Sequence, residues 1–167
     1  MPVTPSDCAQ RARNVRLLCV DVDGVLTDAG MYYGHDGEVL KKFNTRDGMG
    51  LARVREAGVA VAIISGEDSA IVHARAAKLK IDDVFIGAAN KRVAIDELCG
   101  RHGLQLEQVA FIGDDLNDLP ALECVGLACA VADAADPVLA AAHFVTKRRG
   151  GDGAVRELCE FLIAAKQ

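Results

Sequence analysis

Aromatic residues are scarce in this chain: they make up 4% of its 167 residues, whereas hydrophobic residues of all kinds make up 51%. A core with so few rings must rely on alanine, valine and leucine, whose compact side chains suit helices packed on a parallel sheet. The length is that of one domain that can bury a core without disulfides or structural metals. We therefore expect residues 1–167 to form a single α/β domain.

An excess of positive charge is also missing. The chain has 19 lysines and arginines against 24 aspartates and glutamates, which gives a net charge of −5. Proteins that hold nucleic acid usually carry a basic patch that neutralises its phosphates. The charge balance therefore argues against nucleic acid as a partner.

Membrane-spanning and disulfide-forming features are lacking too. No stretch approaches the roughly 18 consecutive apolar residues of a spanning helix. Residues 1–16 lack the apolar core of a signal peptide, and we expect their arginines, Arg11 among them, to face solvent. The six cysteines include neither a C-x-x-C pair nor a zinc-ligand spacing, and Cys19 and Cys129 lie in apolar runs. These features predict reduced thiols in a soluble, cytoplasmic protein without a membrane partner.

Residues 17–28, LLCVDVDGVLTD, are the most informative stretch of the chain. The apolar run Leu17–Val20 predicts a buried strand of a parallel sheet, and Gly24 breaks it. Asp21 and Asp23 follow two residues apart, so their carboxylates point to the same side. They stand at the carboxyl end of the strand, where open α/β sheets bind ligands.

Two neighbouring carboxylates repel each other unless a cation or a proton separates them. If a metal screens one aspartate, it can act as a nucleophile while the other acts as general acid and base. A loop of aspartates could instead cap a helix or bind calcium. Calcium loops, however, place ligands at alternate positions and end on a glutamate, which this stretch lacks. The catalytic interpretation is favoured and predicts partner groups at later strand ends.

Strands and helices alternate along the rest of the chain, which is typical of a parallel sheet with helices on both faces. Further strands are expected at residues 59–64, 84–86, 109–112 and 127–131, with helices between them and at 154–166. Residues 28–43 differ, because two short runs flank the turn GHDG and predict a projecting hairpin. A lone hairpin is marginal in water, and Tyr32 and Tyr33 lie on it. We therefore expect a partner subunit to pack against it.

Later strand ends carry the groups that an aspartate pair needs. The hydroxyl of Ser65 could donate to a phosphoryl oxygen and Gly66 would let the backbone approach, although serine–glycine after a strand is often only a turn. Lys91 opens a helix, where a cation opposes the helix dipole, so a ligand role explains its position better than solubility does. A helix cap would explain Asp114 or Asp115 but does not require Asp118 as well.

In this order, the D-x-D-G-x-x-T-D pattern at Asp21–Asp28 and the three later groups resemble the four motifs of the haloacid dehalogenase-type phosphatases. The resemblance covers nearly the whole chain and implies a Rossmann-like, three-layer fold. It implies that Asp21 is a nucleophile that forms an aspartyl-phosphate and that Asp23 is the general acid and base. Asp21, Asp114 and the backbone carbonyl of Asp23 would bind Mg²⁺, which prefers hard oxygen ligands.

The same resemblance assigns supporting roles to other motif residues. Asp118, with Asp115 beside it, would orient bound waters or the lysine from behind the metal ligands. The phosphate would be bound by Gly24, Ser65, Gly66 and Lys91.

The spacing of the motifs leaves no room for a cap domain, which would need roughly 50 or more residues. Only the hairpin and one helix separate Asp21 from Ser65, and only one helix and one strand separate Ser65 from Lys91. A site without a cap must be open to a macromolecule or closed by another subunit.

The segments KKFNTRDGMG, IISGE, GDDLNDLP and RRGGDGAVRE narrow the resemblance to the capless phosphatases of 3-deoxy-2-ulosonate phosphates. Members of this family act on 3-deoxy-D-manno-octulosonate 8-phosphate, a lipopolysaccharide precursor, or on nine-carbon ulosonate 9-phosphates. They form tetramers through their hairpins. The resemblance therefore implies a small sugar-acid phosphate as substrate and a homotetramer in which a neighbouring subunit completes each site.

Glu67 departs from the eight-carbon pattern, which usually has arginine at this position. Together with Arg75 and Lys78 it looks more like the nine-carbon branch, and the three side chains would then bind the sugar acid. Arg75 and Lys78 could equally be a solvated helix face. Both substrate lengths stay open at this point.

Two non-catalytic alternatives exist. A receiver-type signalling domain also phosphorylates an aspartate beside Mg²⁺, but on a middle strand and without a D-x-D motif. A degenerate relative could serve as an oligomerisation module, but every motif residue is present in this chain. The enzyme is favoured over both.

Overall fold

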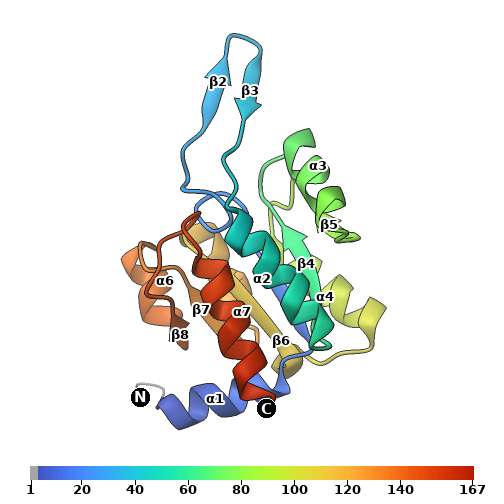
Figure 1. Cartoon of the computed structure of the whole chain (residues 1–167), viewed down its shortest axis with the longest axis vertical. Coiled ribbons are helices and arrows are strands. Elements are labelled where there is room, and N and C mark those ends of the chain that lie inside the picture. Colours follow the sequence, from blue (N-terminus) through green and yellow to red (C-terminus); the bar gives the residue numbers. More distant parts are fainter. Residues whose placement is uncertain (1–3) are drawn as a thin grey trace.

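The computed structural model describes residues 4–167, which form three layers with a hairpin rising from one end (Figure 1). Six parallel strands make up the central sheet in the order β5-β4-β1-β6-β7-β8. Their bounds are β1 Leu17–Val20, β4 Ala60–Ile64, β5 Asp83–Phe85, β6 Val109–Gly113, β7 Leu127–Ala130 and β8 Phe144–Val145. The expected α/β, Rossmann-like class without a cap is confirmed.

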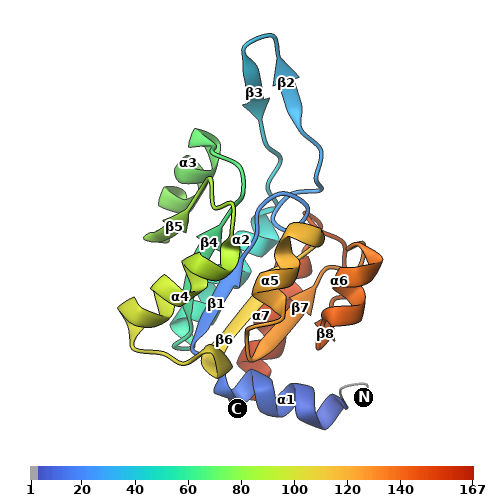
Figure 2. The ribbon, with the colours of Figure 1, turned by 180° about the vertical axis from the view of Figure 1, so that it is seen from behind.

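Helices cover both faces of this sheet. Helices α2 and α7 lie side by side over one face in Figure 1, and α4 and α5 lie over the other in Figure 2. The helices are α1 Pro5–Asn14, α2 Thr45–Glu56, α3 Ala70–Lys78, α4 Lys91–His102, α5 Leu119–Leu122, α6 Asp136–Ala141 and α7 Ala154–Ala165, with short 3₁₀ turns at Leu106–Gln108 and Leu116–Asp118. None of the helices within residues 4–167 is long and apolar enough to cross a bilayer.

The core is aliphatic, as the composition suggests. All four residues of β1 are buried, and β1 pairs with β4 on one side and with β6 on the other. Among the described residues, Phe111 is the one aromatic side chain in the fully buried core. Cys19 and Cys129 are fully buried, as expected. The central strand β1 is therefore held by both neighbouring strands and by its buried side chains. This also fixes the position of the residues that follow its carboxyl end.

Helix α1 was not expected from the sequence. The Thr4 hydroxyl accepts a bond from the Asp7 backbone N–H, and the Asp7 carboxylate accepts one from the Thr4 backbone N–H. This reciprocal cap was visible in the pattern T-x-x-D. The expectation that Arg11 faces solvent is wrong, because Arg11 is half-buried and donates to the Gly126 carbonyl oxygen at 2.6 Å.

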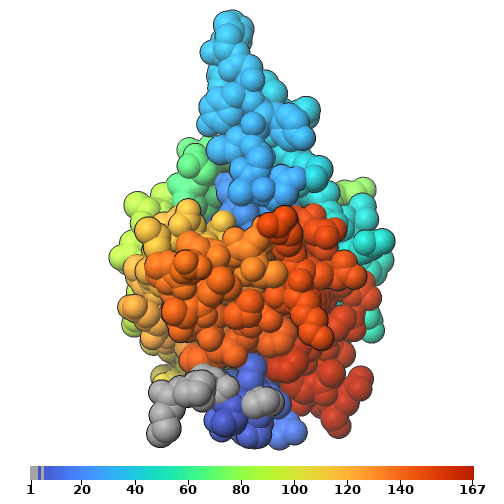
Figure 3. Space-filling model, turned by 90° about the vertical axis from the view of Figure 1, so that its left-hand side faces the viewer, coloured from blue at the N-terminus to red at the C-terminus, as the bar shows by residue number. Residues whose placement is uncertain are grey.

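The predicted hairpin is present, with strands β2 Tyr32–Gly34 and β3 Gly37–Leu40. It stands clear of the body of the molecule in the side view of Figure 3. Its side chains are unusually exposed for apolar groups: Tyr33 is 64% exposed and Leu40 61%. Exposed apolar groups gathered on one element are typical of an interaction surface.

Candidate active site

The motif residues meet at the carboxyl ends of three adjacent strands, β4, β1 and β6. Val20, the last residue of β1, pairs with Ile63 and Ile112, so the chain segments that follow all emerge at one edge. A pocket of about 200 Å³ opens there. It is lined by Asp21, Asp23, Ala29, Ser65, Gly66, Glu67, Asp114, Asp115 and Asn117.

A buried ionic cluster forms the floor of this site. The Lys91 Nζ atom lies 2.7 Å from Asp21 Oδ1 and 2.5 Å from Asp118 Oδ1. All three residues are buried, with 2% of Lys91, 4% of Asp21 and none of Asp118 exposed. Lys91 is the first residue of α4, and the Asn90 side chain caps that helix by accepting a bond from the Arg92 N–H. The lysine therefore enters the core beneath the pocket.

Asp118 also shapes the loop that follows β6. Its second carboxylate oxygen accepts bonds from the backbone N–H groups of Asp114 at 2.8 Å and Asp115 at 3.3 Å. Gly113 permits this turn, because a Cβ atom there would lie 2.4 Å from Asp118 Oδ2. Asp118 thus positions both Lys91 and the backbone that carries Asp114.

The acidic groups fit a divalent cation. Carboxylate oxygens of Asp21, Asp114 and Asp118 all lie within 4.8 Å of one another. Both oxygens of Asp118 are engaged, one by Lys91 and the other by two backbone N–H groups, whereas Asp21 contacts Lys91 through Oδ1 alone, so Asp21 and Asp114 each keep an oxygen for a ligand role. Gly24, with a φ of +85°, makes this approach possible, because a Cβ atom there would lie 1.9 Å from Asp114 Oδ2. Hard oxygen donors of this kind suit Mg²⁺ and similar ions.

The electrostatics point the same way. Burial, and then the neighbouring Asp118, raise the pKa of Asp21 to about 8. The same two causes raise the pKa of Asp114 to about 6. Burial alone would lower the pKa of Lys91, but its contacts with Asp21 and Asp118 outweigh this and hold that pKa above its usual value. One lysine does not balance the carboxylates, so the site favours a further positive charge.

Lys41 is a residue of this site that the sequence did not single out. Its Nζ atom lies 2.6 Å from Asp23 Oδ1 and 2.5 Å from Glu38 Oε1, and its side chain is fully buried. The Ser69 hydroxyl donates to the other Glu38 oxygen at 2.6 Å. The available signal was the pair Lys41–Lys42 directly after β3, since adjacent residues of an extended chain point to opposite sides.

The residues expected to bind phosphate or sugar divide into two groups. Ser65 is buried at the pocket and its hydroxyl accepts the Glu67 N–H at 3.2 Å, while Gly66 and Glu67 are exposed in the lining. Arg75 lies over the Phe43 ring at 5.4 Å, and Lys78 is exposed in the last turn of α3. Neither Arg75 nor Lys78 lines the pocket of its own chain, so their role stays a prediction about a neighbouring subunit.

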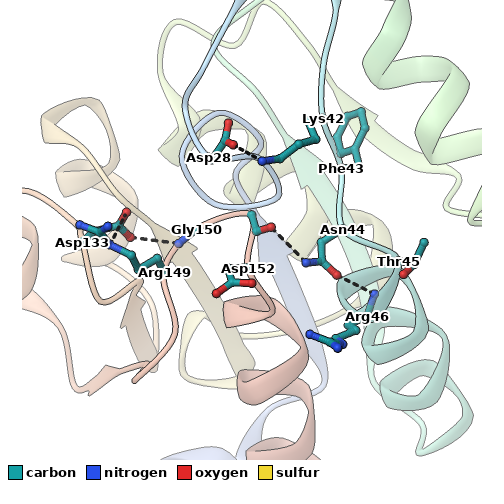
Figure 4. Close-up of a pocket in the computed structure, with 11 residues that line it drawn as sticks. Asp28, Lys42, Phe43, Asn44, Thr45, Arg46, Asp133, Arg149, Gly150 and Asp152 are labelled. Carbon is teal, nitrogen blue, oxygen red and sulfur yellow. Dashed lines mark hydrogen bonds and ion pairs between the residues drawn. The ribbon is translucent and has the colours of Figure 1, made fainter.

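A larger hollow of about 670 Å³ lies at the foot of the hairpin, beside the RRGGDG segment (Figure 4). The Asn44 side chain donates to the Gly151 carbonyl oxygen at 3.1 Å, and the Gly151 N–H donates to the Val25 carbonyl oxygen at 3.0 Å. A Cβ atom on Gly150 would lie 1.7 Å from the Gly24 oxygen. The glycine-rich segment therefore braces the loop that carries the two catalytic candidates.

Comparison with known proteins agrees with this geometry. Residues 78–158 match the model of the haloacid dehalogenase-like hydrolases. The chain is 47% identical over 160 residues to the 3-deoxy-D-manno-octulosonate 8-phosphate phosphatase of Yersinia pestis, a match that covers 96% of this chain and 86% of that protein.

Solved structures with a similar fold contain bound metals. The phosphatase of the same name from Moraxella catarrhalis, in complex with a magnesium ion, a phosphate ion and a KDO molecule, has a TM-score of 0.94 at 36% identity, covering 98% of this chain and 94% of that one. The cobalt-bound deoxy-D-mannose-octulosonate 8-phosphate phosphatase from Haemophilus influenzae has a TM-score of 0.92 at 41% identity, covering 94% and 92%. Together with the acidic cluster, these relatives indicate a divalent-metal site.

The raised pKa of Asp21 predicts how the metal-free protein responds to pH. The pKa is about 8 in the folded protein against a reference value of 3.8, so the stabilising contribution of this carboxyl is complete below the reference value and is lost as pH rises toward 8. Asp21→Asn should therefore unfold at a higher temperature than the wild type near pH 8 in chelator, by on the order of a few degrees.

Thermal unfolding followed by circular dichroism at about pH 6 and about pH 8 measures this difference. The control is Asp96→Asn, a half-exposed surface carboxylate on α4 whose removal should change neither curve. A gap between wild type and Asp21→Asn that shrinks as pH rises would contradict the prediction.

Proposed function

The chain belongs to the 3-deoxy-D-manno-octulosonate 8-phosphate phosphatase family of the haloacid dehalogenase-like hydrolases, and on this basis we propose that it is a Mg²⁺-dependent phosphatase that removes the terminal phosphate of a 3-deoxy-2-ulosonate phosphate. One observation carries the proposal most directly: Asp21 and Asp23 line one pocket at the carboxyl end of β1, above the buried Lys91–Asp118 pair. The relatives named above supply the substrate class.

In the proposed reaction Asp21 is the nucleophile. Its carboxylate oxygen attacks phosphorus, the bond to the sugar oxygen breaks, and Asp23 gives a proton to that oxygen as it leaves. A water molecule then attacks the aspartyl-phosphate and passes a proton to Asp23, so the bond to Asp21 breaks and phosphate is released. Asp23 ends the cycle protonated, as it began.

Lys91 and the strand-end groups hold the reacting atoms. The contact between Lys91 and Asp21 fixes the direction of the nucleophile, and the ammonium offsets part of the charge on the phosphate. The Ser65 hydroxyl and the Gly24 and Gly66 backbones would bind the phosphoryl oxygens. When Mg²⁺ is held by Asp21, Asp114 and the Asp23 carbonyl, it supplies the remaining positive charge for the phosphoryl group.

Assembly completes the proposal. The exposed hairpin, with Tyr32 at 50% and Val39 at 53% exposure, supports a homotetramer in which neighbours cover each other's open pockets. The side chains of Arg75 and Lys78 would reach a neighbour's site rather than their own. A cytoplasmic location is part of the proposal and is supported by the six cysteines, all of which are unpaired.

The mechanism predicts that Asp21→Asn abolishes hydrolysis, lowering kcat by about 10³-fold or more, because an amide cannot act as the nucleophile. Phosphate release from a panel of small phosphoesters, measured with Mg²⁺ and with excess chelator, tests this. Asp96→Asn should keep wild-type rates. Full activity in chelator, or near-normal turnover by Asp21→Asn, would exclude the proposed chemistry.

If the hairpins form the subunit contacts, introducing a charged side chain on the hairpin should separate the subunits. Met31→Glu and Tyr33→Glu should lower both the mass measured by light scattering and the kcat/KM, the latter by about tenfold or more, because a neighbour no longer orients the substrate. Val93→Glu is a matched control, since Val93 is 60% exposed on α4 rather than on the hairpin. A fully active wild-type monomer would refute the proposal of shared sites.

We predict that Glu67 and Lys78 determine which sugar acid the enzyme prefers. We expect a nine-carbon ulosonate 9-phosphate to be turned over at least as efficiently as 3-deoxy-D-manno-octulosonate 8-phosphate. Lys78→Ala should raise KM for these sugar acids about tenfold, the usual loss for one charged hydrogen bond, and leave an aryl phosphate unaffected. His73→Ala, exposed on the same helix, is the control. Strong preference for the eight-carbon substrate, unaltered by changes at Glu67 or Lys78, would show these residues to be a solvated face.

A further inference from the structure

Each of the two aspartates of the D-x-D motif contacts its own buried lysine. Lys91 from α4 contacts Asp21, and Lys41 from the base of the hairpin contacts Asp23 at 2.6 Å. The first pair is accounted for by the chemistry of the phosphoryl group. The phosphoryl chemistry does not explain the Lys41–Asp23 pair, because the fully buried Lys41 side chain does not line the pocket.

The contact is held from several sides. Glu38, three residues before Lys41, contacts the same ammonium at 2.5 Å, and its other oxygen accepts the Ser69 hydroxyl. Ser69 is the residue that precedes α3, and its hydroxyl makes no cap bond to that helix. The ammonium therefore lies between two carboxylates, one of which is tied to a neighbouring helix. A long, flexible side chain is fixed in one place.

The geometry at Asp23 separates the roles of its two oxygens. Lys41 binds Oδ1, whereas Oδ2 has no bonding partner among the described residues, and Asp23 lines the pocket. With Oδ1 engaged, Oδ2 is the atom left to carry a proton between Asp23 and a bound phosphoester.

We propose that Lys41 is a positioning residue for proton transfer, which holds the Asp23 carboxyl so that Oδ2 faces the leaving oxygen of the substrate. This inference rests on the function proposed above, in which Asp23 protonates the leaving group. It assigns the hairpin a second role, since Lys41, directly after β3, positions the acid while the exposed apolar side chains of β2 and β3 would contact other subunits.

The test exploits the leaving group. An alkoxide needs a proton as it leaves, whereas p-nitrophenolate is stable enough to leave without one. The parameter to compare is kcat/KM, because it reports formation of the phosphoenzyme alone. Lys41→Met should therefore lower kcat/KM for an alkyl phosphate about 10–100-fold, part of the 10²–10⁴-fold that a general acid contributes. For p-nitrophenyl phosphate the loss should be about threefold at most. Lys41→Arg, which keeps the charge, should recover part of the alkyl activity.

Three controls make the outcome decisive. Lys42→Met alters the adjacent lysine, which contacts Asp28 and is 60% exposed, and should change neither rate. Asp23→Asn should show the same leaving-group dependence as Lys41→Met, only larger. Thermal unfolding shows whether each variant is folded, and Lys41→Gln, which retains a neutral donor, replaces Lys41→Met if the latter is not.

The outcomes separate this inference from the proposed function. Equal losses for both substrates in the Lys41 variants, with a selective loss in Asp23→Asn, would overturn the role of Lys41 and leave the mechanism standing. No leaving-group dependence in Asp23→Asn would overturn the role of Asp23 itself, and with it the inference. A selective loss in both, with recovery in Lys41→Arg, is the result that we expect.

Discussion

The contact of Lys91 with Asp21 and Asp118 is the interaction on which the rest of the site depends. The buried Lys91–Asp118 pair is stable only while both partners are present, and removing one partner of such a pair typically costs about 3–5 kcal/mol. The cluster joins β1, α4 and the loop after β6. Burial, and then the neighbouring Asp118 carboxylate, hold the pKa of Asp21 near 8. The proposed nucleophile thus lies where the carboxylate form is unfavourable without a cation.

Close backbone packing holds the loops that carry this charged cluster in place. Gly24 and Gly150 lie so near their neighbours that a single Cβ atom would collide with Asp114 or with the Gly24 carbonyl. The glycine-rich segment before α7 is far from β1 in sequence, yet its Gly151 N–H bonds to the Val25 oxygen. A loop pressed against another loop has little freedom to move, so the oxygens that would bind a metal are held before it arrives. Such preorganisation is what electrostatic catalysis requires.

Much of this arrangement follows from the sequence because a parallel sheet brings strand ends together. Once Asp21, Ser65 and Asp114 were placed after strands, their meeting at one edge required only that the strands be adjacent. Side chains that act across loops were harder to anticipate. Lys41 was missed because the pair Lys41–Lys42 indicates that one of the two side chains can point inward, but not that it reaches Asp23. Arg11 was misjudged for a similar reason, since its partner, the Gly126 carbonyl, is distant in sequence.

The hairpin combines an exposed apolar surface with a buried contact to the active site. Its strands β2 and β3 expose apolar side chains that a monomer gains nothing by displaying, while Lys41, directly after β3, holds its fully buried ammonium against Asp23. A two-stranded hairpin is marginally stable by itself, so its average position depends on what packs against it. Any contact that orders the apolar surface of β2 and β3 therefore also restricts Lys41, and with it the carboxyl that would donate the proton. A cap domain usually closes and orders such a site from above. In the proposed assembly, one short element, anchored through Glu38 to Ser69, would transmit that order from a neighbouring subunit to the proposed acid.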